Sequence, residues 1–89
     1  MHRVRVLITG RVQGVGFRYF ALHRATQLGL AGRVRNLPGG AVEVDAEGER
    51  EPLGRLVEAL REGPRAARVD AVDERWSEGP PRHDRFEIA

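Results

Sequence analysis

The chain has 89 residues, enough for a single domain with one two-layer core, and we therefore treat residues 1–89 as one domain. Its formal charge is only +2 although it carries 15 basic residues, all of them arginine, so the balance does not favour a nucleic-acid-binding surface. The absence of cysteine excludes disulfides and thiolate chemistry, and no apolar run predicts a membrane span or a secretory leader. We expect a cytoplasmic protein.

The first predicted element is a strand near the N-terminus. Val4, Val6 and Ile8 occupy every second position, which is the period of a strand that buries one face. The strand runs directly into a glycine-rich segment at Gly10. We therefore expect its buried face to pack against helices.

A glycine-rich turn, Gly-Arg-Val-Gln-Gly-Val-Gly-Phe-Arg over residues 10–18, separates this strand from a predicted helix. Glycines adopt positive φ and bring backbone N–H groups together, and a helix start adds unpaired donors, so the turn suits an anion. Arg18 adds a planar guanidinium that can bind two phosphate oxygens. A P-loop is excluded because the chain has no lysine, and a dinucleotide fingerprint is excluded because Tyr19 stands in place of its third glycine. Such turns also close ordinary strand-to-helix connections, so both interpretations stay open.

A helix and a β-hairpin are predicted next. Apolar residues recur at helical spacing from Phe17 to about Gly29, where a glycine can end the helix. Residues 30–36 and residues 42–47 read as two strands, joined through a Leu-Pro-Gly-Gly turn. Val34 shares a face with the apolar residues of the second strand only if the loop has an odd number of residues.

The other face of this hairpin is charged. Arg33 and Arg35 are expected opposite acidic residues of the partner strand, namely some of Glu43, Asp45 and Glu47. We interpret these charges as a solvated ladder and assign it no function.

The second half of the chain supplies a second helix and further strands. Apolar residues at helical spacing predict a helix that Gly63-Pro64 ends, namely Leu53, Leu56, Val57 and Leu60. Val69, Val72 and Trp76 indicate a strand whose irregular spacing is consistent with a bulge, and residues 85–88 form a last strand. The order strand, helix, strand, strand, helix, strand is the split βαβ. We predict an α+β, ferredoxin-like two-layer sandwich with an antiparallel sheet and two helices on one face.

The titratable residues give little sign of acid–base or metal chemistry. His2 is expected at a frayed terminus, His23 on a helix and His83 in a loop, and no two histidines have metal-ligand spacing. The acidic residues show no marked catalytic pair and are interpreted as solvated surface. The Trp76 side chain, which does not titrate, is interpreted as a packing residue of the core or of the sheet face. We therefore predict no metal and no cofactor.

Asn36 has two possible roles at the end of its strand. Asparagine commonly caps a turn by bonding the local backbone, and the residue type alone favours that role. In the split βαβ, however, this strand can bring its end towards the glycine-rich turn. An amide there could point at the anion.

Four stretches together resemble the acylphosphatase family. They are the Gly10–Arg18 turn, the segment Gly-Leu-Ala-Gly-Arg-Val-Arg-Asn-Leu-Pro-Gly-Gly-Ala-Val-Glu over residues 29–43, and Gly63-Pro64 with the terminal Phe-Glu-Ile of residues 86–88. The resemblance implies hydrolysis of acyl phosphates to a carboxylate and phosphate, without a metal or a covalent intermediate. It implies that Arg18 and Asn36 are catalytic, the asparagine orienting water. It also implies a phosphate-binding loop made of Gln13, Gly14, Val15, Gly16, Phe17 and Arg18.

The resemblance also leads to expectations about the binding partners of the protein. We predict a small-molecule acyl phosphate substrate, no nucleic acid, no membrane and a monomer. Residues 13–20 imitate the RNP1 motif of RNA-recognition domains, but that motif belongs on the third strand and not after the first. A module of a larger assembly, as in hydrogenase maturation factors, is the other alternative, and the end of the chain at Ala89 favours a stand-alone enzyme.

Overall fold

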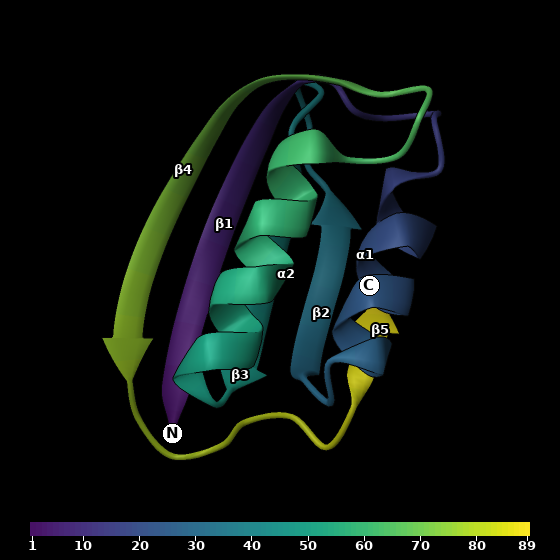
Figure 1. The fold of residues 1–89 in the computed structure, drawn as a ribbon. Coiled ribbons are helices and arrows are strands. Elements are labelled where there is room, and N and C mark those ends of the chain that lie inside the picture. The colour runs from purple at the N-terminus through teal and green to yellow at the C-terminus, as the bar shows by residue number, and fades with distance from the viewer.

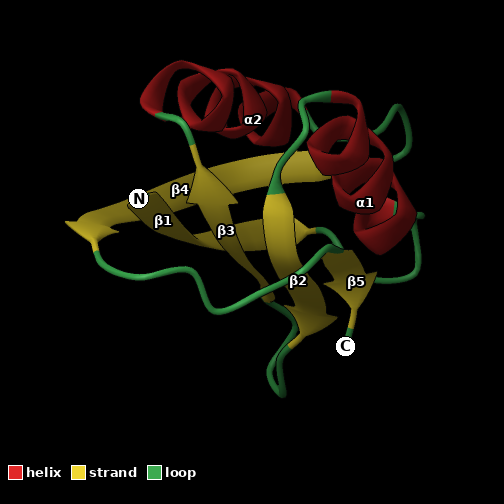
Figure 2. Cartoon of the chain, turned by 90° about the horizontal axis from the view of Figure 1, so that it is seen from below, coloured by secondary structure: helices red, strands yellow, loops and turns green.

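The computed structural model describes all residues 1–89 and consists of one sheet with both helices on the same face (Figure 1). Figure 2 shows the helices as a separate layer above the strands. The predicted α+β, ferredoxin-like sandwich is confirmed. Neither helix is long and apolar enough to span a bilayer. The elements in chain order are β1 (His2–Arg11), α1 (Phe17–Gln27), β2 (Ala31–Asn36), β3 (Val42–Gly48), α2 (Arg50–Glu62), β4 (Arg68–Glu78) and β5 (Phe86–Ile88).

The strands lie in the order β4-β1-β3-β2-β5. The four longer strands pair antiparallel as predicted, but β5 pairs parallel to β2, which makes the sheet mixed. The reason is the path of residues 79–85, which leads the chain from the end of β4 to the end of the sheet where β2 begins (Figure 2). The last strand therefore starts beside Gly32 and runs in the direction of β2.

The hairpin has the register that the sequence requires. Val34 pairs with Val44 and Asn36 pairs with Val42, which leaves residues 37–41 as a loop with an odd number of residues. The bulge is confirmed as well, because the partner of β1 shifts from Ala71 at Thr9 to Val69 at Gly10. Asp70 is the extra residue on β4.

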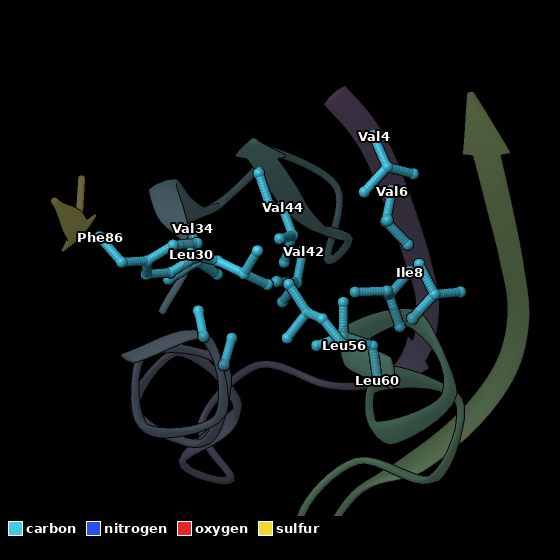
Figure 3. Packing of buried hydrophobic residues seen from close by; sticks show 14 of the residues in the cluster. Val4, Val6, Ile8, Leu30, Val34, Val42, Val44, Leu56, Leu60 and Phe86 are labelled. Atoms are coloured by element: carbon cyan, nitrogen blue, oxygen red, sulfur yellow. The ribbon is translucent and has the colours of Figure 1, made fainter. Parts of the chain in front are cut away.

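The core lies between the helices and the sheet and contains 17 buried hydrophobic residues (Figure 3). From α1 it takes Phe17 with two alanines, whose short side chains let the helix lie close to the sheet. From α2 it takes the four predicted residues, Leu53, Leu56, Val57 and Leu60. The apolar face of each predicted helix is therefore the face that is buried.

The open face of the sheet corrects the interpretation of the acidic residues as solvated. Glu43 and Glu47 expose only 3% and 2% of their surface. The Glu47 carboxylate accepts hydrogen bonds from the Arg82 backbone N–H at 2.9 and 3.0 Å, and Arg3 donates to the Pro80 carbonyl at 2.7 Å. The connection from β4 to β5 therefore covers one end of this face, and the charges beneath it are structural. Strand periodicity placed these residues on the open face, but it could not show that a distant loop crosses it.

Candidate active site

The glycine-rich turn, the end of β2 and the start of α1 meet at one end of the molecule (Figure 1). The turn occupies residues 12–16, between the end of β1 and Phe17. Gly14 and Gly16 have φ angles of 74° and 80°, so the predicted positive φ is confirmed. Residues with a Cβ rarely adopt this conformation, and the turn therefore depends on glycine.

The backbone donors at the start of α1 are available to a ligand. Gly16 is the N-cap residue, no side chain caps the helix, and the first turn contains no acidic residue. The first N–H groups of a helix have no intrahelical acceptor and carry part of the positive end of the helix dipole. This helix start therefore presents uncompensated positive charge beside the glycine turn.

A small hollow of about 120 Å³ lies at this point, lined by Val12, Gly14, Gly16, Phe17, Arg18, Tyr19 and Asn36. Arg18 and Asn36 come from α1 and from β2, so the structure brings together the two side chains that the sequence predicted as catalytic. The Oδ1 atom of Asn36 is buried and accepts no hydrogen bond. A buried acceptor without a partner is costly, and Oδ1 of Asn36 is the one buried side-chain polar atom of the molecule in this position.

The predicted loop residues do not all face this hollow. Val15 packs against the hydrophobic core. The side chain of Gln13 turns towards the β2–β3 loop, where Nε2 donates to the Leu37 carbonyl at 2.8 Å and to the Ala41 carbonyl at 2.9 Å. Phe17 belongs to the core although it also borders the hollow.

Sequence reasoning missed Val12 and Tyr19 as lining residues. Tyr19 is 70% exposed, one of only two large hydrophobic side chains on the surface. The signal for it was the helical period, since Tyr19 lies off the buried stripe of Phe17, Ala21 and Ala25. An aromatic residue off that stripe in the first turn had to project from the helix beside Arg18.

The histidines lie apart from the hollow. His2 is not frayed as expected, because it pairs with Gly48 of β3 and with Glu78 of β4. His83 lies 3.8 Å from the Glu47 carboxylate, on the open face. No group of three or more His, Asp or Glu side chains is arranged to hold a metal ion.

Glu43 is the buried carboxylate nearest the hairpin loop in sequence. It accepts hydrogen bonds from Arg5 Nε at 2.8 Å and from Arg35 Nε at 2.9 Å. Burial raises the pKa of the Glu43 carboxyl, but the hydrogen bonds and charges of the two arginines outweigh burial and hold its pKa below the ordinary value. Glu43 is therefore an ionised anchor for two cations and not an acid or a base.

Fold and site together define a small α+β sandwich in which an arginine, an amide and a glycine-rich turn line one hollow. Residues 4–88 match the model of the family described as Acylphosphatase. An acylphosphatase from Thermus thermophilus is 53% identical over 78 residues, which cover 88% of this chain and 89% of the relative. An acylphosphatase from Salinibacter ruber is 49% identical over 86 residues, or 97% of this chain and 90% of the relative.

The structural comparison agrees. The crystal structure of acylphosphatase from Bacillus subtilis matches with a TM-score of 0.96 at 40% identity, covering 100% of this chain and 99% of the other. The chain belongs to the acylphosphatase family. It is a hydrolase that splits acyl phosphates into a carboxylate and inorganic phosphate.

Proposed function

We propose that the glycine turn and Arg18 hold the phosphoryl group of an acyl phosphate and that Asn36 orients the attacking water. The observation that carries this proposal is that Asn36 and Arg18 line the same hollow, together with the absence of any hydrogen bond to the buried Oδ1 atom of Asn36. If Asn36 capped its turn through this oxygen, the atom would accept a local backbone bond. The hairpin loop is instead bonded by Gln13.

The geometry suits a reaction that needs positioning more than acid–base catalysis. Water attacks phosphorus, the bond from phosphorus to the acyl oxygen breaks, and its electron pair leaves on the carboxylate. A carboxylic acid has a pKa of about 4, so this leaving group needs no proton. In a loose transition state the negative charge lies on the equatorial oxygens, where the guanidinium and the N–H groups at the start of α1 stabilise it.

No further side chain is needed to accept the proton of the attacking water or to balance the negative charge of the phosphoryl group. We assign the proton of the attacking water to the phosphate itself, because no carboxylate or histidine lines the hollow. Arg18 and the backbone donors supply the positive charge that a metal would otherwise provide. The proposal therefore includes neither a metal nor a covalent intermediate.

Steady-state hydrolysis of acetyl phosphate with inorganic phosphate as inhibitor tests the proposal. Phosphate presents the same oxygens as the substrate, so we expect competitive inhibition, and we expect activity to persist in a chelator. Purely noncompetitive inhibition would place the anion site elsewhere. Activity that disappears in chelator and returns with zinc or magnesium would contradict the metal-free mechanism.

We also propose that the enzyme acts as a monomer in the cytoplasm. Of the large hydrophobic residues only Met1 and Tyr19 are exposed, and isolated apolar residues do not make a subunit interface. The location rests on the sequence alone. Sedimentation of the purified protein and fractionation of cells test the two statements separately.

A further inference from the structure

We propose that Gln13 is a positioning residue that fixes Asn36, and that its side chain does not bind phosphate. The inference rests on the proposed function, because it assigns Gln13 a role through the water-orienting asparagine. It also departs from the expectation that the whole segment 13–18 contacts the phosphoryl group.

The donors of the Gln13 amide are fully used. An amide nitrogen carries two N–H donors, and both are taken by the carbonyls of Leu37 at 2.8 Å and Ala41 at 2.9 Å. The remaining amide atom is an oxygen, which only accepts hydrogen bonds and would repel an anionic phosphate oxygen. The opposite amide orientation would aim that oxygen at two carbonyl oxygens. The side chain of Gln13 is therefore committed to the hairpin loop.

The two carbonyls stand at the two ends of the loop that follows Asn36. Residues 37–41 connect the last residue of β2 to the first residue of β3, and the Leu37 N–H closes the loop on the Ala41 carbonyl at 2.8 Å. Gln13 bonds to both ends of this loop at once. It thereby fixes the backbone on the C-terminal side of Asn36.

The sheet itself does not provide this connection. Pairing of β1 with β3 ends at Ile8 and Val42, whereas β1 continues along β4 as far as Arg11. Beyond Ile8 the chain that leads into the glycine turn thus leaves the hairpin. The Gln13 amide connects this part of the chain to the hairpin loop.

Asn36 depends on such support from outside. Its Oδ1 accepts no hydrogen bond, so this atom is not oriented by a bond of its own. The direction of the side chain then follows from the backbone around it. A loss of the Gln13 bonds should shift Asn36 relative to Arg18, and a misplacement of about 1 Å can cost on the order of a hundredfold in rate.

A double-mutant cycle tests the inference with acetyl phosphate as substrate and inorganic phosphate as inhibitor. We expect Gln13→Ala to lower kcat about tenfold and to leave the Ki of phosphate within about twofold. In an Asn36→Ala background, Gln13→Ala should lower kcat by less than about twofold, because the group that it positions is gone. Gln27→Ala, an exposed glutamine at the far end of α1, is the matched control and should change neither constant.

A second readout does not depend on turnover. In 15N-labelled protein the side-chain amide signals of Asn36 should shift or broaden in Gln13→Ala and stay unchanged in Gln27→Ala. If Gln13→Ala fails to fold, Gln13→Met keeps the length of the side chain while removing both donors, and the same results are expected of it.

The outcomes separate the alternatives. A phosphate Ki that rises about tenfold, with the full kcat loss retained in the Asn36→Ala background, would show that Gln13 contacts phosphate. Unchanged Asn36 signals in Gln13→Ala, or a lower melting temperature with wild-type kcat, would show that Gln13 only stabilises the fold. Either result would overturn the inference. If wild-type protein does not hydrolyse acetyl phosphate, the proposed function fails, while the amide signals still decide on the positioning.

Discussion

Replacing Arg18 by lysine tests whether charge or geometry holds the phosphoryl group. The change keeps the positive charge but exchanges a planar fork of five donors for a single rotating ammonium. Arg18 is half-buried at the hollow beside Asn36, and it has no carboxylate within 4.0 Å. Its guanidinium is therefore not committed to an ion pair within the protein, and its substitution should affect the site far more than the fold.

The expected loss follows from the misplacement of the substrate. A lysine ammonium cannot donate two parallel hydrogen bonds to two phosphate oxygens as a planar guanidinium does. Loss of the in-line geometry should therefore lower kcat at least about a hundredfold. That factor corresponds to about 2.7 kcal/mol of transition-state stabilisation. The free energy of unfolding should change by no more than about 0.5 kcal/mol, because lysine is a good helix former and Arg18 makes no ion pair that the change would break.

Both quantities are measured on one preparation by acetyl phosphate hydrolysis and by thermal unfolding. An unfolding change of about 0.5 kcal/mol shifts the Tm of a domain of this size by about 2–4 °C. Arg24→Lys, an exposed arginine on the same helix, is the control and should leave kcat unchanged. A folded Arg18→Lys protein with near-wild-type kcat would refute the geometric role of the arginine.

Two further variants test the roles of Asn36 and Glu43. Asn36→Ala should lower kcat strongly with little change in KM, because the Asn36 amide is expected to act mainly in the transition state. Wild-type turnover together with a loss of about 0.5–2 kcal/mol in the free energy of unfolding would show that Asn36 has a structural role. Glu43→Gln should lower the free energy of unfolding by about 1 kcal/mol at pH 7, because Arg5 and Arg35 lose the charge they share. Since the folded-state pKa of Glu43 lies below its unfolded value, this stabilisation is present above about pH 4.3 and is lost as the pH falls through the folded pKa. Denaturant unfolding at pH 7 and pH 3 should therefore show a difference that shrinks in acid, and a constant difference would contradict the ionic role.

The parts of the fold that follow a local period could be predicted from the sequence. Strand alternation identified Val4, Val6 and Ile8 as the buried side of β1, and the helical period identified the four buried residues of α2. The register of the hairpin followed from one condition, that Val34 and Val44 share a face. These features depend on neighbours in the chain, and the structure agrees with each of them.

Features that depend on distant segments could not be predicted. The burial of Glu47 follows from residues 79–85 crossing the open face, and no pattern around position 47 signals that crossing. The parallel pairing of β5 with β2 has the same origin, because it depends on where that long connection returns. Periodicity shows the face on which a residue lies, and only the complete path of the chain decides what covers that face.

The candidate site depends on both kinds of information, on local sequence patterns and on the path of distant segments. Arg18 could be selected from the sequence as a candidate phosphate ligand because its residue type and its position at a helix start are both read from one continuous segment. Asn36 required the topology of the split βαβ, which brings the end of β2 to the glycine turn, and the shared hollow agrees with that reasoning. Gln13 lies in the same segment as Arg18, and its residue type alone suits either phosphate or backbone. Its two bonds to Leu37 and Ala41 depend on where the hairpin loop lies, 24 and 28 residues further along the chain. A continuous motif can therefore contain side chains with different contacts, since Arg18 lines the hollow while the Gln13 side chain bonds to the neighbouring loop, and the three-dimensional structure is needed to tell them apart.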